Sequence, residues 1–412
     1  MLRSMREPPR LRAVESTLSL CLEGYCFASN RRAQLAADAF SCRLLLQKAV
    51  FIGGPEAIGP FFDTALFKRE GVLPRRIRRT LLGDGGIHSL DGDEQRCRKA
   101  TFLELLGPPR TAAFRAILER YWNAGIVSWR HDRHVGIFQA LCPILCGAAC
   151  EFAGIPTTEM SSELCDDLFA MVDSFGAVGP RHWRGRFARQ RRERWAADLI
   201  LNVRRGFLAP PQFSALQVIA RQRGADGRPL DVNVAAVEML NAIRPIMAVP
   251  YFAELAAALL IENPDYRRTL EDPAFLESFV HELRRYCPFT PFLGARTCRN
   301  VEWTEYVIPK ETLTLLDVYG VHHDERIWRN ANAFIPDRFI GRNAFESFVV
   351  QQGGGDHAIG HRCAGEWITV EALKLIVTRL AALSWRNKSA SLSYDLRRIP
   401  ARLRSPVVLD LT

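Results

Sequence analysis

The chain has 412 residues, of which 48% are apolar and 24% are charged, and its formal net charge at pH 7 is +10. Its 11 cysteines are an odd number and form no CxxC pair, which argues against a disulfide framework and a structural zinc site. No apolar run reaches the roughly 18 residues of a membrane span, and no signal-peptide pattern follows the basic start. Without repeats or linkers, we expect one cytoplasmic domain over residues 1–412, with a poorly ordered N-terminus at 1–20.

Helical periodicity dominates the chain. The predicted helices, in chain order, are 55–62, 94–106, 114–122, 138–153, 235–262, 274–286 and 367–382. Pro108 and Pro109 are predicted to end the second of these helices. Two short segments, 301–303 and 312–316, show strand patterns and are predicted to pair with each other. The predicted fold class is mainly α with a small antiparallel β-sheet.

An arginine cluster stands at residues 181–194, which contain seven arginines and continue at helical spacing into 195–200. A nucleic-acid-binding patch is one interpretation of such a cluster. No nucleic-acid-binding motif accompanies it, so a solvated helix face is the favoured interpretation and no nucleic-acid partner is expected. A docking surface for an anionic substrate or for membrane headgroups is the remaining alternative.

The long apolar helix predicted at 235–262 contains Arg244 followed by Pro245. Pro245 removes one helix hydrogen bond and is predicted to open the helix there. Arg244 has only apolar neighbours, and a buried cation is costly without an anionic partner. That partner is either a structural carboxylate, such as Glu238, or the carboxylate of a substrate. Pro250 interrupts the same helix again without an evident reason.

Glu282 and Arg285 are three residues apart on the helix predicted at 274–286, so their side chains lie on one face. Such an ExxR pair is weak evidence by itself, because surface helices carry similar pairs routinely. Downstream, Arg338 follows in a Pro-x-Arg-Phe segment with aromatic neighbours. We predict that these three charged residues form a buried network behind the loop of Cys363.

Cys363 follows a glycine-dense loop, 353–360, and precedes the helix predicted at 367–382. Glycines let the backbone pass close to a flat ligand, and a position just before a helix N-terminus favours a thiolate. His361 and Arg362 stand beside it, where they could pair with carboxylates. These features meet the requirements of a thiolate ligand to haem iron. The other interpretation is one more buried thiol among many.

The ExxR helix, the Pro-x-Arg-Phe segment and the cysteine loop, in this order, resemble the cytochrome P-450 superfamily. The resemblance runs from about Glu23 to Ala401 and is closest to the fatty-acid peroxygenases, which use hydrogen peroxide to hydroxylate fatty acids beside the carboxylate. The segments that carry this closer likeness are 42–45 (CRLL), 90–92 (LDG), 98–99 (RK), 178–183 (VGPRHW) and 320–324 (GVHHD). The resemblance implies the cytochrome P-450 fold and a haem b cofactor, with Cys363 as the axial ligand of the iron.

The resemblance also implies how the substrate is held. Arg244, followed by Pro245, would clamp the fatty-acid carboxylate above the haem. Leu82, in place of an aromatic residue, and Phe289 would line the substrate pocket. His88 takes a position that is Gln in several hydroxylases and His in members that form terminal alkenes. A loop histidine bonded to the backbone is an equally good interpretation of His88.

For the cofactor, the resemblance implies haem contacts from Lys99, His361 and Gln95. Gln95 departs from the family pattern, because it stands where the family has a histidine. Two further departures flank the cysteine loop: Gln351 and Ala364 each replace a proline. These differences favour a shifted substrate range or reduced activity.

The predicted function is a haem-thiolate peroxygenase that hydroxylates fatty acids at the α or β carbon, with decarboxylation to terminal alkenes as a second outcome. The segment around Arg244 and Pro245 has no Ser or Thr for the acid–alcohol pair of oxygen-using relatives, so the substrate carboxylate would move the proton and no redox partner is expected. Two other classes stay open. One is an oxygen- and ferredoxin-dependent monooxygenase, and the other is a non-catalytic haem or fatty-acid binding protein, which the Gln95 and Pro250 departures would suit.

Overall fold

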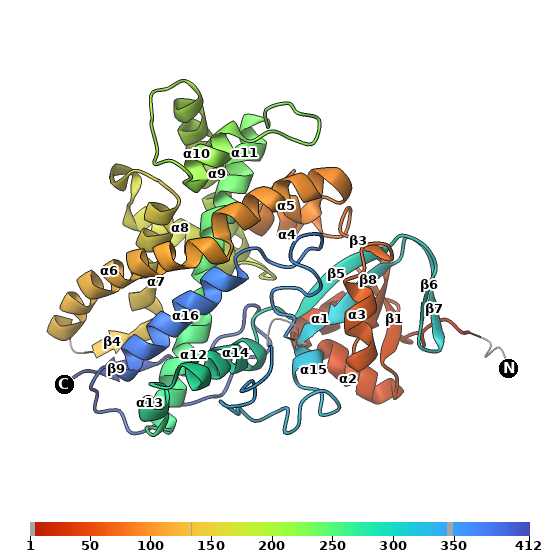
Figure 1. The fold of residues 1–412 in the computed structure, drawn as a ribbon. Helices are drawn as coiled ribbons and strands as arrows, with labels where there is room; N and C mark the ends of the chain where they lie inside the picture. The colour runs from red at the N-terminus through yellow and green to blue at the C-terminus, as the bar shows by residue number, and fades with distance from the viewer. Residues whose placement is uncertain (1–4, 133, 344–348) are drawn as a thin grey trace.

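The computed structural model describes residues 5–132, 134–343 and 349–412. Figure 1 shows a large helical region on one side of the molecule and, on the other, a smaller region where α1, α2, α3 and α15 lie around a β-sheet. The predicted fold class is confirmed, because helices make up most of the chain and the sheets are small.

The helices of the first half are α1 (Thr17–Glu23), α2 (Cys26–Leu35), α3 (Ile58–Phe61), α4 (Arg75–Ile77), α5 (Gly92–Leu106), α6 (Pro108–Asp132), α7 (Ile137–Phe152), α8 (Ser162–Asp173) and α9 (Pro180–Arg204). Those of the second half are α10 (Ala215–Arg221), α11 (Val232–Ile243), α12 (Val249–Glu262), α13 (Tyr266–Thr269), α14 (Pro273–Tyr286), α15 (Val318–His322) and α16 (Glu366–Ala381). Short helical turns are η1 (Pro55–Ala57), η2 (Arg78–Leu82), η3 (Ile87–Ser89), η4 (Thr157–Glu159) and η5 (Arg244–Ala248).

The strands are β1 (Ala39–Leu44), β2 (Gln47–Ile52), β3 (Phe67–Lys68), β4 (His134–Gly136), β5 (Phe292–Thr297), β6 (Val301–Trp303), β7 (Tyr306–Ile308), β8 (Leu313–Asp317) and β9 (Val408–Asp410). The main sheet has the order β1-β2-β8-β5-β3. Its pairs are antiparallel except β2–β8, which is parallel. Two separate two-stranded sheets pair β4 with β9 and β6 with β7.

One predicted strand pairing is wrong. The 301–303 strand pairs with β7 in the register Val301↔Ile308, whereas the 312–316 segment lies in the main sheet as β8, between β2 and β5. The reason is local, because a two-residue turn with Thr304 at φ 53° joins β6 directly to β7 in a short hairpin. A second hairpin, β1–β2, was not predicted, since its turn residues Leu45 and Leu46 have φ of 50° and 65°, where Asn or Gly is usual.

Prolines mark three helix boundaries. Pro108 and Pro109 occupy the first turn of α6, so the predicted 114–122 helix is a part of a much longer one. Pro245 lies at the start of η5, a short and more tightly wound helical segment that separates α11 from α12 and interrupts the predicted 235–262 helix. Pro250 then lies in the first turn of α12, where a missing N–H breaks no helical hydrogen bond. This position explains Pro250.

The core of the helical region is built from apolar side chains of α6, α7, α8, α9, α11, α12, α14 and α16. The stretch Val232–Glu262 is long and apolar enough to cross a bilayer by composition, but 83% of its most apolar window is buried inside the protein. It therefore packs as a core segment. A second, smaller core lies between the sheet and its helices.

The arginine cluster at 181–194 lies on α9, with some of its side chains exposed and others buried inside the protein. Arg189 is fully buried, with Nε bonded to Glu193 Oε1 at 2.6 Å and Nη1 donating to the Leu81 carbonyl at 2.9 Å. Arg192 is also buried and bonds to Asp167 Oδ2 at 2.7 Å. The expectation of a solvated face is thus wrong for these two arginines, because carboxylates and a carbonyl compensate their burial.

The predicted poorly ordered stretch 1–20 includes residues 1–4, which lie outside the described residues. Residues 5–16 lie along the sheet region and bond to it, so the prediction of poor order is wrong for this part of the stretch. The Arg6 N–H donates to the Glu305 carbonyl at 3.1 Å, and the Leu11 N–H donates to the Ser41 carbonyl at 2.9 Å.

Candidate active site

A cavity of about 420 Å³ lies where the helical region meets the main sheet. It is bordered by α5, η3, η5, β5, the cysteine loop and the start of α16. The structure brings all the predicted catalytic, substrate and cofactor residues to its wall, namely Leu82, His88, Gln95, Lys99, Arg244, Pro245, Phe289, His361 and Cys363. These residues come from five separate stretches of the chain.

The cysteine loop needs its glycines. Gly353 has φ of 88°, which L side chains rarely adopt, and a Cβ on Gly354 would lie 2.6 Å from the Phe62 ring. The Cys363 N–H donates to the Gln352 carbonyl at 2.8 Å, which folds the loop back and leaves the thiol on the cavity wall. Three residues later, α16 begins at Glu366.

The Cys363 thiol is not held as a thiolate by the helix end alone. Burial raises the pKa of Cys363, and this effect outweighs the hydrogen bond from the Gly365 backbone and the nearby cations, which lower it. An anionic sulfur at this position therefore needs a further positive charge, such as a metal ion in the cavity.

Polar contacts hold the cysteine loop in shape from both sides. Arg362 Nε bonds to Glu366 Oε2 at 2.6 Å, and His361 Nε2 lies 3.0 Å from Asp91 Oδ1. The predicted pairing of both neighbours with carboxylates is present, although burial lowers the pKa of His361. On α5, Gln95 Nε2 donates to the Gly360 carbonyl at 3.1 Å, and Lys99 Nζ donates to the Arg362 carbonyl. Gln95 is thus a loop contact as well as a cavity residue.

Two cations on the cavity wall, one buried and one half-buried, lack a carboxylate partner in the described part of the chain. Arg69 Nη1 is buried without a hydrogen-bond partner, and burial lowers the pKa of Arg69 to about 10. Burial likewise lowers the pKa of Lys99. Sequence reasoning missed Arg69, because one arginine in the segment Lys68-Arg69-Glu70 has no pattern that separates it from a surface residue. With His361, these cations suit the two propionates of a haem whose iron Cys363 would bind.

Arg244 is the third unpaired cation of the cavity. It is 5% exposed and makes no hydrogen bond or ion pair within residues 5–132, 134–343 and 349–412. Burial, followed by the charge of Arg189, lowers the pKa of Arg244 to about 9. Glu238, the structural carboxylate considered as its partner, instead accepts from Arg98 Nη1 at 2.9 Å and from the Ile87 N–H at 2.9 Å. Arg244 is therefore free to bind an anion that enters the cavity.

His88 lies on η3 and lines the cavity. Its pKa is lowered to about 3, first by burial and then by the charges of Arg244, His361, Arg189 and Lys99. The imidazole is therefore neutral at pH 7, and no hydrogen bond from His88 to the described backbone supports the loop-histidine interpretation. An anion beside Arg244 would oppose the second of these effects and make protonation easier.

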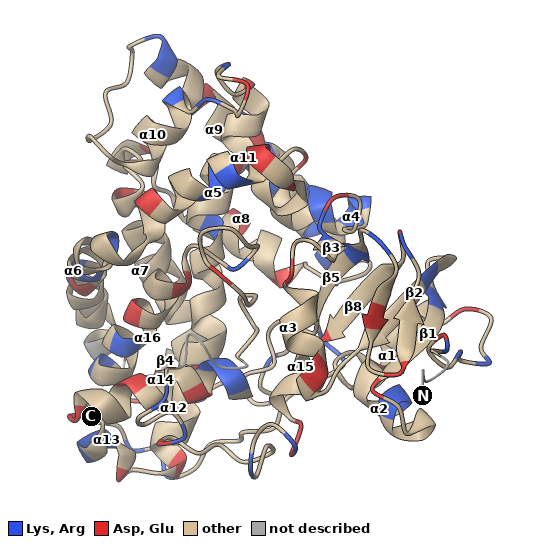
Figure 2. Cartoon of the chain, turned by 45° about the vertical axis from the view of Figure 1, so that its right-hand side comes forward, with Lys and Arg blue, Asp and Glu red and all other residues tan. Residues whose placement is uncertain are grey.

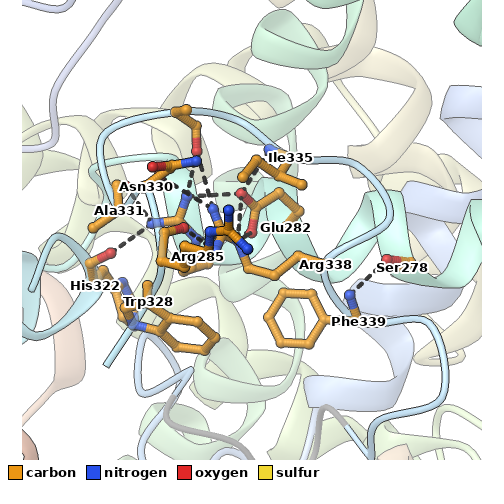
Figure 3. A network of polar contacts seen from close by, with 12 residues as sticks. Ser278, Glu282, Arg285, His322, Trp328, Asn330, Ala331, Ile335, Arg338 and Phe339 are labelled. Carbon is orange, nitrogen blue, oxygen red and sulfur yellow. Dashed lines mark hydrogen bonds and ion pairs between the residues drawn. The ribbon is translucent and has the colours of Figure 1, made fainter. Parts of the chain in front are cut away.

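Behind the cysteine loop, Glu282, Arg285 and Arg338 form a buried network (Figure 3). Arg285 donates twice to Glu282, at 2.7 Å each, and Arg338 Nε lies 3.1 Å from both Glu282 oxygens. Arg285 Nη1 also donates to the His322 carbonyl at 2.5 Å, and His322 Nε2 accepts from the Val350 N–H at 3.0 Å. The network thereby connects α14 to the chain entering the cysteine loop.

Replacing Arg285 with Ala should leave Glu282 buried without its bidentate partner. Removal of one member of a buried pair costs about 3–5 kcal/mol, so the urea midpoint of unfolding should fall sharply. Arg268→Ala is the matched control, because Arg268 forms an exposed pair with Asp265 at 2.9 Å and such pairs contribute about 1 kcal/mol or less. Similar midpoints for the two variants would show that the network does not support this region.

A half-buried cysteine on a glycine-rich loop, facing a cavity with unpaired cations in a mainly helical fold, defines a haem-thiolate protein. A family model described as "Cytochrome P450" matches residues 262–378. Among solved structures, cytochrome P450EX alpha (CYP152N1) with myristic acid has a TM-score of 0.92, is 31% identical and aligns over 98% of each chain. Ligand-free cytochrome P-450 OleT has a TM-score of 0.93 at 30% identity, also over 98% of each chain.

Cytochrome P450SP alpha (CYP152B1) is 34% identical, with a TM-score of 0.91 over 96% of this chain and 98% of that one. Curated relatives match over shorter stretches. Cytochrome P-450 81F2 of Arabidopsis thaliana is 27% identical over 128 residues, which is 30% of this chain and only 26% of the plant protein. The chain belongs to the cytochrome P-450 family, and the solved structures it resembles confirm the predicted family and fold.

Proposed function

We propose that this protein is a haem-thiolate peroxygenase that oxidises fatty acids with hydrogen peroxide. The observation that carries the proposal is Arg244, a buried cation without a carboxylate partner in the described chain, on the wall of the cavity that Cys363 also lines. Further support comes from two similar solved structures, one of cytochrome P450EX alpha with myristic acid and one of an OleT variant in complex with arachidonic acid.

The cavity suits a molecule with one charged end and an apolar chain. Its apolar wall includes Leu73, Phe102, Ile246, Phe252, Phe289 and Phe292. The guanidinium of Arg244 is planar and can donate two parallel hydrogen bonds to a carboxylate. A bound carboxylate would remove the energetic penalty of the unpaired buried charge, which gives fatty acids a large advantage over neutral lipids.

Cys363 would bind the haem iron, and Arg69, Lys99 and His361 would hold the propionates. When bound, haem with a thiolate ligand supplies O–O bond cleavage and the oxidising power for C–H hydroxylation. The residues Val232–Glu262 contain no Ser or Thr, and Glu238 is engaged by Arg98, so these helices offer no acid–alcohol pair for delivering protons to dioxygen. The substrate carboxylate, held by Arg244, would instead accept a proton from one oxygen of hydrogen peroxide and pass it to the other oxygen, which then leaves as water.

Carbons two and three of the substrate are nearest the clamped carboxylate, so the products would be 2- or 3-hydroxy acids. One oxygen of the peroxide enters the product and the other leaves as water. His88 is the side chain that would influence the second outcome, in which carbon three loses a hydrogen, the carboxylate leaves as carbon dioxide and a terminal alkene forms. Both oxygens of the peroxide then leave as water. This chemistry needs no redox partner, and we place it in the cytoplasm.

Product analysis with hydrogen peroxide and a long-chain saturated fatty acid tests the proposal. The holoenzyme should give products oxidised at carbon two or three, and catalase should stop the reaction. A reductase with NAD(P)H should add nothing once catalase is present. His88→Gln should raise the ratio of hydroxy acid to alkene, because an amide holds a hydrogen bond but carries no titratable proton.

Oxidation that needs a reductase and resists catalase would identify an oxygen-dependent monooxygenase instead. Fatty-acid binding without any turnover would identify a binding protein. Hydroxylation toward the methyl end would show that the carboxylate is not anchored at Arg244.

A further inference from the structure

Three large apolar side chains are exposed near the start of α9. Val178, Trp183 and Phe187 are 61%, 56% and 53% exposed, which is far more than a packed core or a domain interface leaves to such residues. Trp183 and Phe187 are four residues apart on one helix face, and their rings stack with centroids 6.1 Å apart. They form an aromatic ridge on the surface.

Arginines surround this ridge. The segment Arg75–Arg79 contains four arginines and no acidic residue, and Figure 2 shows the basic residues gathered at α4. It packs against the ridge, because Arg76 Nη2 donates to the Ala177 carbonyl at 2.7 Å and Arg76 Nε donates to His182 Nδ1 at 3.4 Å. Residues 180–187 add three more arginines and again no acid.

Several of these charges are uncompensated. Arg78 and Arg79 share Asp84, and Arg181 lies 3.5 Å from Asp173. In contrast, four arginines of the same surface have no carboxylate within ion-pair distance among the described residues. Together with the ridge they form what we call the aromatic–arginine patch, made up of Val178, Trp183, Phe187, Arg75, Arg76, Arg184 and Arg186.

The composition of the patch is that of a surface that binds a lipid bilayer. Exposed Trp and Phe enter the boundary between headgroups and acyl chains, while arginines beside them are attracted to anionic headgroups. A nucleic-acid site would also need cations, but Val178, the most exposed apolar side chain of the three, is aliphatic and gives a base no ring to stack on, whereas it suits acyl chains. The four arginines without a carboxylate within ion-pair distance leave the patch positively charged, which disfavours cationic partners.

The patch is continuous with the wall of the cavity. Phe175, in the loop that carries Val178, packs on Phe289 with ring centroids 6.0 Å apart, and Phe289 lines the cavity. Val72 and Leu73, just before the basic segment 75–79, line the cavity as well. The segment 72–79 and the loop 174–179 therefore each contact the cavity wall at one point and the patch at another.

We propose that the aromatic–arginine patch docks this protein on the surface of membranes that contain anionic lipid, with the cavity wall toward the bilayer from which its substrate comes. The docking is peripheral and reversible. The choice of substrate source rests on the proposed function, whereas the docking itself depends only on the patch and is measured without peroxide.

Co-sedimentation of the haem-loaded protein with lipid vesicles tests the docking. Wild type should bind vesicles of phosphatidylcholine with phosphatidylglycerol, and binding should weaken as salt rises. The double variant Trp183→Ser/Phe187→Ser should bind about tenfold more weakly or worse, because it lacks the two aromatic side chains that are transferred from water into the bilayer. Phe207→Ser/Phe213→Ser is the matched control, since these residues are 79% and 62% exposed beyond the other end of α9 and should not affect binding.

The charge contribution is tested in parallel. Arg75→Gln/Arg184→Gln should reduce binding to the anionic vesicles roughly tenfold or more. Arg221→Gln/Arg228→Gln, which removes two exposed arginines elsewhere, should leave it unchanged. With brominated lipid in the vesicles, Trp183→Phe should still bind but lose a component of the tryptophan quenching seen in wild type.

Failure of wild type to bind anionic vesicles, or equal binding by the patch and control variants, would overturn the docking proposal. Patch-dependent binding of duplex DNA without any binding to vesicles would also overturn it, in favour of a nucleic-acid partner. Patch-dependent vesicle binding by a protein that does not oxidise fatty acids would support docking and contradict only the proposed function.

Discussion

Replacing Cys363 with Ala is expected to abolish the red-shifted Soret band that the reduced, carbon-monoxide-bound holoenzyme shows when a thiolate binds the iron. The thiol is the only cysteine side chain on the cavity wall formed by the described residues. No other cysteine can therefore replace it without a large rearrangement. Peroxide-dependent oxidation of fatty acids should be lost together with the band.

The control for this variant is Cys298→Ala, which removes a partly exposed thiol away from the cavity. It should keep the thiolate spectrum and full activity. A thiolate-type spectrum that persists in Cys363→Ala would remove the basis for assigning the axial ligand and, with it, the proposed chemistry.

The second large effect is expected at Arg244. Arg244→Ala removes a charge-assisted contact to the carboxylate worth about 1.5–3 kcal/mol, which corresponds to a roughly tenfold to 150-fold loss of fatty-acid affinity. Turnover should fall further, because the misplaced carboxylate can no longer transfer the proton of the peroxide. The haem spectrum should not change, and kcat/KM with fatty acid and peroxide is the measurement.

Stability separates this explanation from misfolding. Arg244 is buried without a described partner, so its removal relieves a desolvation penalty, and the urea midpoint should stay equal or rise. Arg244→Lys keeps a charge without the bidentate geometry and should show an intermediate loss.

In wild type, a short carboxylate such as acetate should partly support peroxide oxidation of substrates that lack a carboxylate. Undiminished fatty-acid oxidation by Arg244→Ala would place the carboxylate elsewhere.

Local patterns in the chain were enough to predict the elements whose signal lies within a few residues. The loop before Cys363, the Glu282–Arg285 spacing and the break at Pro245 are of this kind, because glycine, proline and i,i+3 pairs act through the adjacent backbone. The same patterns predicted most long helices to within a few residues. They also singled out Arg244, since a lone arginine in an apolar helix is costly anywhere in the interior.

What the tertiary structure decided depends on contacts between distant segments. Only the folded chain shows that Glu238 is engaged by Arg98, 140 residues away, which leaves Arg244 without that carboxylate. Arg69, an ordinary arginine in sequence, becomes an unpaired cation of the cavity because β3 and β5 place it there. The pairing of β2 with β8, and the burial of Arg189 within an arginine cluster, have the same origin. In each case the energy of the residue is set by its partners and its exposure to water, and those are fixed only when segments far apart in the chain pack together.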